Sequence, residues 1–168
     1  MKNYFSSAVA RLLLPVLVAG AALGTASCSK NEPAAVVKQD FSAADDATIQ
    51  KYLADNKITN ARKQPSGLYY VPVSTNPNGQ QATAGRTVTV DYKGALLDGS
   101  TFDSGTIPFQ LGAGRVIAGW DEGIALMRLS EKSILLIPSG LAYGSQSPSS
   151  KIPANSVLRF DVTLTKIQ

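Results

Sequence analysis

The residues that can do chemistry in this chain are limited, because the sequence contains no histidine and one cysteine, Cys28. Ser-His-Asp and Cys-His nucleophile systems need an imidazole to accept the proton, so both classes are excluded. Structural zinc needs four His or Cys ligands and a disulfide needs two cysteines, so we expect neither, and no cofactor. Carboxylates, tyrosines, backbone amides and the walls of an apolar pocket remain as candidates.

Two polar motifs suggest other chemistries and are set aside. Asp121 and Glu122 are adjacent carboxylates and suggest the catalytic acid pair of a glycosidase. Neighbouring residues on a helix point about 100° apart, so the two do not face one substrate. Acidic residues are favoured in the first turn of a helix, and we therefore expect a helix to start here. Gly112 and Gly114 suggest a phosphate loop, yet the third glycine comes only at Gly119 and no Lys-Ser/Thr follows. The net charge is +4 without a cluster of Lys and Arg, so we expect no nucleic-acid partner.

The first part of the chain has the features of an export leader. Residues 1–28 have a basic start, and residues 12–23 form an apolar stretch shorter than the ~20 residues of a membrane-spanning helix. Small residues precede Cys28, as at the cleavage site of bacterial lipoproteins, which predicts lipidation of Cys28; an ordinary secreted protein is the alternative. Residues 29–41 are predicted to be a flexible tether. We therefore expect a lipid-anchored protein of the bacterial cell envelope. The preferred location is the outer membrane, with the protein facing the periplasm.

Residues 42–66 are interpreted as an N-terminal helix and a linker. The helix is predicted to start near residue 43, after a Ser cap, and to end near residue 56. Ile49, Tyr52 and Leu53 are spaced so that they share one face of this helix. We expect that face to pack on the following domain or on a second copy, which allows a homodimer through this helix.

The domain at residues 67–168 has the alternation typical of strands. Residues 87–92 and 157–167 alternate apolar and polar side chains, so each is predicted to be a strand with one apolar face. Shorter strands are predicted at residues 68–71, from residue 101 onward, and at residues 133–137. Residues 119–129 carry the only helical pattern of this part. The predicted fold class is α+β: an antiparallel β-sheet curled around one short α-helix, with the extra N-terminal helix.

Six motifs of this domain resemble, in order and spacing, those of the FKBP-type peptidyl-prolyl cis-trans isomerases. They are residues 90–94, 98–104, 116–123, 137–138, 141–144 and 158–162. The resemblance covers residues 67–168 and implies an FKBP-like fold. It further implies that the chain rotates Xaa-Pro bonds to assist folding of exported proteins, with Xaa-Pro polypeptides as substrates and macrolides as inhibitors. A non-catalytic FKBP-shaped module that binds proline-containing segments or a partner protein is the alternative.

The resemblance also implies which residues form the pocket. The expected catalytic set is Tyr92, Phe102, Asp103, Ile117, Trp120, Tyr143 and Phe160. The expected substrate-binding set is Val116, Ile152 and, at one further position where either residue fits, Ile107 or Phe109. Trp120 is expected beneath the proline ring, Asp103 is expected to orient its neighbours, and the Tyr143 hydroxyl and Ile117 N–H are expected to donate hydrogen bonds to the substrate.

The residue types themselves suit this reaction. Rotation of an X-Pro amide must break its resonance, with a barrier of about 18–20 kcal/mol, but no bond to another atom has to form. The twisted amide has lost part of its charge separation, so a dry aromatic cleft binds it better than the planar amide. The polar segment 145–151, with Pro148 where some members have histidine, and the short segment 103–116 are expected to alter substrate preference.

Overall fold

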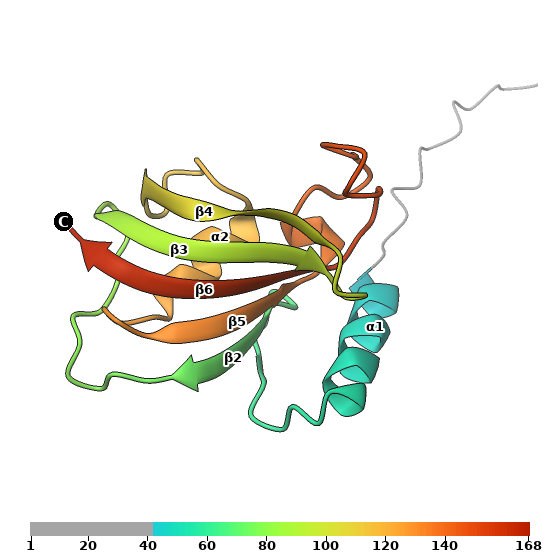
Figure 1. Ribbon diagram of the computed structural model, residues 1–168, viewed down its shortest axis with the longest axis horizontal. Helices are drawn as coiled ribbons and strands as arrows, with labels where there is room; N and C mark the ends of the chain where they lie inside the picture. Colours follow the sequence, from blue (N-terminus) through green and yellow to red (C-terminus); the bar gives the residue numbers. More distant parts are fainter. Residues whose placement is uncertain (1–41) are drawn as a thin grey trace, which may run out of the picture. The chain divides into compact units, whose positions relative to one another are not determined.

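The structure of the chain, a computed structural model, describes residues 42–168 (Figure 1). The predicted leader, the lipidation of Cys28 and the tether at residues 29–41 lie outside the described residues. The elements are α1 (Ser42–Asp55), β1 (Arg62–Lys63), β2 (Tyr69–Ser74), β3 (Thr87–Leu96), β4 (Thr101–Gln110), α2 (Ala118–Ala125), β5 (Lys132–Ile137), the 3-10 helix η1 (Ser139–Leu141) and β6 (Leu158–Ile167).

The strands form one antiparallel sheet, in the order β1-β2-β5-β6-β3-β4. The C-terminal strand β6 lies in the middle and pairs with both β5 and β3. Figure 1 shows the longer strands side by side as a curved sheet with α2 behind it. The sheet curled around a short helix is the predicted architecture.

One face of the sheet packs on α2. The predicted inward residues of β6 are all buried, and they join Trp120 and Ile124 of α2 in one apolar cluster. Those residues of β6 are Leu158, Phe160, Val162 and Leu164. Because successive side chains of a strand point to opposite faces, this strict alternation places every second residue of β6 in the core.

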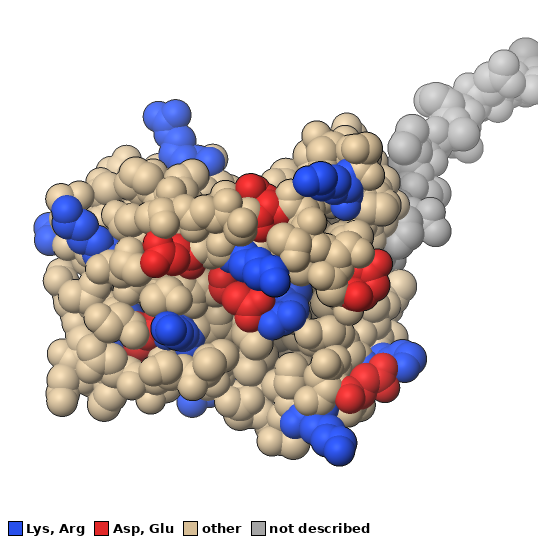
Figure 2. Space-filling view, viewed as in Figure 1, with Lys and Arg blue, Asp and Glu red and all other residues tan. Residues whose placement is uncertain are grey.

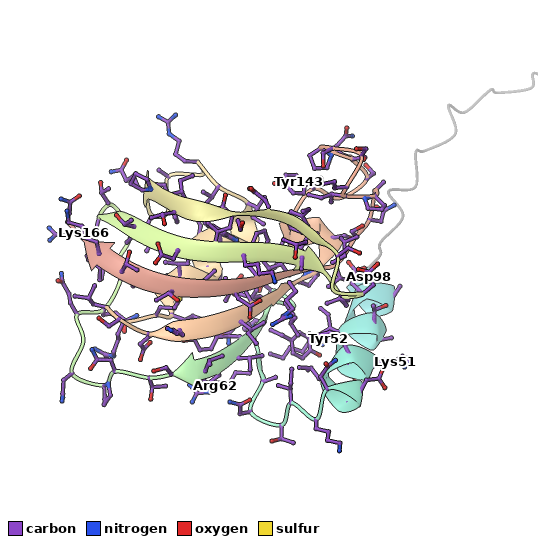
Figure 3. All side chains as sticks on the ribbon, in the orientation of Figure 1. Lys51, Tyr52, Arg62, Asp98, Tyr143 and Lys166 are labelled. Carbon is purple, nitrogen blue, oxygen red and sulfur yellow. The ribbon has the colours of Figure 1, made fainter. Side chains whose placement is uncertain are left out.

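Helix α1 packs on one end of the other face of the sheet (Figure 1). Fully buried Ile49 lies in a second cluster with Tyr69, Leu136 and Val157. Figure 3 shows Tyr52 of α1 pointing toward the sheet while Lys51 points away from it, as the predicted apolar face requires. The predicted packing of this helix on its own domain is therefore observed.

Two helix boundaries differ from the sequence prediction, and the short elements β1 and η1 were not predicted. Helix α2 ends at Ala125, four residues earlier than predicted, because the amides of Leu126 and Met127 bond three residues back, to Gly123 and Ile124, in a tighter final turn. Helix α1 includes Ser42, the predicted cap, as its first residue.

The charged side chains are mixed on the face of the molecule that Figure 2 shows. On the face shown in Figure 2, acidic and basic side chains are interspersed, and no stripe of one sign runs across it. Among residues 42–168, no helix is long and apolar enough to span a membrane. No group of three metal-ligating side chains was found within the same residues.

Candidate active site

A cavity of about 390 Å³ lies on the α2 side of the sheet, beside the loop that follows η1. It is lined by Tyr92, Phe102, Asp103, Ile107, Arg115, Val116, Ile117, Trp120, Tyr143, Pro148, Ser149, Ile152 and Phe160. The structure thus brings together all the pocket residues expected from the sequence except Phe109. The volume of the cavity lies within the usual range for small-ligand sites, ~300–1,000 Å³.

The structure distinguishes the two residues left open for one pocket position. Ile107 lines the cavity and is 37% exposed, whereas Phe109 is 7% exposed and lies in the core with its ring 5.8 Å from that of Trp120. The two residues are two apart on β4 and share a face of the strand. Which of the two borders the cavity therefore depends on its position along β4. The sequence pattern does not show this position, because both residues have the same place in the alternation.

Three lining residues were not among the expected site residues. Arg115 lines the cavity and directly precedes the motif at residues 116–123. Being next to that motif is the only sequence feature that indicated it. Pro148 and Ser149 belong to the polar loop for which the sequence predicted an effect on substrate preference. None of the three carries a pattern that identifies it without the fold.

Aromatic rings build the floor of the cavity. The Trp120 ring lies 5.1 Å from the Tyr92 ring and 5.2 Å from the Phe160 ring, with interplanar angles of 76° and 84°. Such edge-to-face contacts hold the rings in fixed orientations. The buried indole nitrogen of Trp120 has no hydrogen-bond partner within residues 42–168. The floor is therefore apolar and rigid, with one unpaired N–H donor.

A glycine in β3 allows two of these rings to meet. A Cβ atom at Gly94 would lie 2.5 Å from the Phe102 ring and 2.7 Å from the Phe160 ring. The centroids of these rings are 5.5 Å apart in an edge-to-face contact. Any side chain at this position would displace a wall of the cavity.

A tyrosine and a carboxylate interact at the rim. The Tyr92 hydroxyl donates a hydrogen bond of 2.8 Å to Asp103, whose other carboxylate oxygen accepts one from the Ser104 amide at 2.9 Å. The hydrogen bond to Asp103, followed by burial, raises the pKa of Tyr92 above its usual value. In the described part of the chain no Lys or Arg forms an ion pair with Asp103. Within the described residues, the hydrogen bond from Tyr92 thus joins Asp103 to the aromatic rings of the floor.

The loop between β4 and α2 is fixed by a carboxylate of α2. Asp121 accepts hydrogen bonds from the amides of Gly112 and Gly114, at 2.8 and 3.0 Å. This explains both motifs that the sequence analysis set aside, because the glycine amides bind a carboxylate of the chain itself. The fixed loop leads to Ile117, which lines the cavity and whose backbone N–H has no acceptor among residues 42–168.

Comparisons with known proteins agree with this geometry. The family described as FKBP-type peptidyl-prolyl cis-trans isomerase matches residues 78–165. The chain is 42% identical over 136 residues to "Peptidyl-prolyl cis-trans isomerase FKBP53" of Arabidopsis thaliana, which covers 77% of this chain and 28% of that protein. It is 38% identical over 107 residues to "Peptidyl-prolyl cis-trans isomerase Fkbp12" of Drosophila melanogaster, covering 61% of this chain and 99% of that protein.

The fold is also found in solved structures. The crystal structure of FkpA from Escherichia coli aligns with a TM-score of 0.64 at 34% identity, over 76% of this chain and 61% of that chain. The predicted fold is thereby confirmed. The match spans less than a third of the Arabidopsis relative. It spans nearly the whole fly relative, which therefore corresponds to one part of this chain.

Proposed function

Because the chain belongs to the FKBP-type peptidyl-prolyl cis-trans isomerase family, we propose that its aromatic cavity accelerates rotation about Xaa-Pro bonds of polypeptide substrates. The observation that carries this proposal is the aromatic floor formed by Trp120, Tyr92, Phe102 and Phe160. The backbone N–H of Ile117, which also lines the cavity, has no acceptor among residues 42–168. The cavity offers no histidine or cysteine for covalent catalysis. Bond rotation needs none.

In this proposal each wall of the cavity has a distinct effect on the amide. The proline ring packs on Trp120, and the apolar walls exclude water, which favours the less polar twisted amide over the planar one. The Ile117 N–H and the Tyr143 hydroxyl donate hydrogen bonds to substrate carbonyls. Asp103 holds the Tyr92 hydroxyl at the rim and thereby fixes the ring that packs against Trp120.

We further propose that the protein acts in the cell envelope of a bacterium, on exported polypeptides. The support is the leader-like sequence of residues 1–28 and the similarity of the domain to a bacterial FkpA. Lipidation at Cys28, outer-membrane attachment and binding of macrolides belong to the same proposal. A homodimer through α1 would use the face that carries Lys51, because the Ile49 face is buried against the sheet.

The proposed activity is tested with a protease-coupled isomerisation assay on an Ala-Xaa-Pro-Phe peptide series. Residues 29–168 are suitable, since they contain all the residues that the structure describes, 42–168. We expect acceleration that falls in Asp103→Ala and Tyr143→Phe. The matched controls are Asp55→Ala and Tyr52→Phe, which remove the same groups from α1, outside the cavity lining.

Two results would contradict the proposal. A folded protein that accelerates no peptide of the series would favour the non-catalytic module. Equal losses in the cavity variants and the α1 controls would place the activity elsewhere. Attachment is tested separately, by labelled fatty-acid incorporation into the full chain and into Cys28→Ser, with label expected only in the former.

A further inference from the structure

A buried carboxylate joins α1 to the 3-10 helix η1. Asp45 and Ser139 are 5% and 2% exposed. One carboxylate oxygen of Asp45 accepts hydrogen bonds from both the backbone amide and the hydroxyl of Ser139, at 2.8 and 2.7 Å. A buried carboxylate is costly unless it is hydrogen-bonded, and two donors from one residue fix the relative position of α1 and η1. The proposed reaction makes no direct use of this pair.

Ser139 in turn fixes the start of the loop beyond η1. Its carbonyl oxygen accepts hydrogen bonds from the amides of Ala142 and Gly144, at 3.0 and 2.8 Å. The Gly144 carbonyl then accepts the amide of Asn155 at 2.6 Å, which closes the loop at its far end. Gly144 and Asn155 both have positive φ, 56° and 57°, so the chain reverses sharply at each of these points. The two ends of the loop thus depend on the position of Ser139.

The loop held in this way forms one side of the cavity. Tyr143, Pro148, Ser149 and Ile152 all line it. Tyr143 is 38% exposed and is labelled in Figure 3 on the loop that rises above the sheet, and its hydroxyl makes no hydrogen bond within residues 42–168. The position of its hydroxyl therefore depends on the hydrogen bonds at the base of the loop.

We propose that Asp45 is a positioning residue for the active-site loop, and that α1 acts as a brace that holds Tyr143 over the aromatic floor. The series of contacts runs from Asp45 through Ser139 to Gly144 and Asn155. This inference rests on the proposed isomerase activity of the cavity. It assigns α1 a role in that activity although no residue of α1 lines the cavity.

The neighbouring residues of α1 provide matched comparisons. Asp46 is the next residue, but its carboxylate accepts from Tyr69 and Gln50 and pairs with Lys63, with no contact to η1. Ile49 packs in the apolar cluster of α1 and makes no hydrogen bond through its side chain. Asp46→Asn therefore controls for loss of charge on α1, and Ile49→Val for loosened packing of α1 on the sheet.

The experiment measures kcat/KM of the full chain in the peptide assay for the wild type, Asp45→Ala, Asp45→Asn, Asp46→Asn and Ile49→Val. We expect Asp45→Ala to lower kcat/KM by about five- to tenfold, within the usual range for coupling through a packed network. Asp45→Asn keeps a side-chain oxygen for the Ser139 donors and is expected to restore most of the activity. Asp46→Asn and Ile49→Val are expected to stay within about twofold of the wild type.

A second measurement is independent of activity. Hydrogen exchange at the amides of Ala142 and Gly144 is expected to accelerate in Asp45→Ala, while the amides of β3 and β6 keep their protection. The double variant Asp45→Ala/Tyr143→Phe is expected to lose no more activity than the larger of the two single losses, because both act on the same hydroxyl.

The outcomes separate the two proposals. An inactive wild type with accelerated exchange in Asp45→Ala would overturn the isomerase activity while leaving the brace intact. An active wild type with unchanged exchange and kcat/KM in Asp45→Ala would overturn the brace alone. Equal losses of activity in Asp45→Ala and Ile49→Val would also overturn it, since general loosening of α1 would then suffice.

Discussion

The two faces of the sheet show what distinguishes a binding surface from a packing surface in this chain. Helix α2 packs on one face, and α1 packs on one end of the other face. On the α2 side, large aromatic rings meet edge to face and leave a cavity of about 390 Å³ between them. On the α1 side, Ile49 and Leu136 are fully buried and fill the contact. The aromatic rings on the α2 side line an open cavity, whereas the apolar contact of α1 with the sheet is filled mostly by aliphatic side chains. A second cavity, of about 290 Å³, lies beside the start of α1, where its lining includes Asp46, Lys63 and Ser66.

The largest expected effects come from two adjacent leucines of β5. Leu135 and Leu136 are both fully buried, but they point to opposite faces, Leu135 toward α2 and Leu136 toward α1. We expect Leu135→Ala to lower the free energy of unfolding by about 4 kcal/mol and Leu136→Ala by about 2 kcal/mol, the upper and lower parts of the usual range. We expect this difference because local undocking of α1, with the rest of the domain still folded, would relieve part of the loss at Leu136. Urea unfolding measures both values.

Equal losses for the two leucines would show that α1 unfolds together with the sheet. A larger loss for Leu136→Ala would reverse the comparison of the two faces.

The next effect concerns the cavity wall. Gly94→Ala places a methyl group against Phe102 and Phe160, so both rings must move. We expect a loss of about 1–3 kcal/mol of stability, as for other overpacked cores. We also expect kcat/KM to fall by about tenfold or more, because the positions of the rings determine the shape of the cavity.

The control is Gly99→Ala, at a glycine that has no neighbour within 4 Å of an added Cβ. Its φ of +92° means that the substitution lowers stability, but we expect no change in kcat/KM. Similar activity losses in both variants would contradict this.

A smaller effect is expected from the rim hydrogen bond. The pKa of Tyr92 is raised above its usual value of 10.0, chiefly by the hydrogen bond to Asp103. A raised pKa in the folded state means that this bond stabilises the fold fully below the unfolded pKa, and the contribution is lost as pH rises through the folded pKa. Ultraviolet titration is expected to show Tyr92 ionising later than a free tyrosine, with a smaller delay in Asp103→Asn. An unchanged titration in that variant would contradict the assignment.

The smallest effect is expected on the α1 side. The pKa of Asp46 is lowered from its usual value of 3.8, first by the hydrogen bond from Lys63 and then by that from Tyr69. The contribution is therefore present above pH 3.8 and is lost as pH falls through the folded pKa. Because the pair is largely solvated, we expect the difference in stability between wild type and Asp46→Asn to be close to experimental error at neutral pH and absent in acid. Thermal unfolding at several pH values measures it; a large difference would contradict the argument.

Much of the fold followed from local pattern. The alternation of β6 predicted which of its residues face the core, because a strand has a side-chain period of two wherever it lies. The apolar spacing of Ile49, Tyr52 and Leu53 likewise predicted the face of α1 that packs on the domain. The motifs of the domain predicted its family and most of the residues that line its cavity, because their order along the chain is set by the order of the strands.

Other features depended on tertiary structure alone. The choice of Ile107 over Phe109 as a lining residue depends on where Trp120 of α2 packs against β4, and residues on one face of a strand give no local signal of that position. The contact between Asp45 and Ser139 joins residues 94 apart in the sequence. From the sequence alone, an aspartate in the first turn of a helix is explained equally well by its favourable interaction with the helix dipole. A periodic sequence specifies which face is buried, whereas only the folded chain determines which distant residues meet on that face.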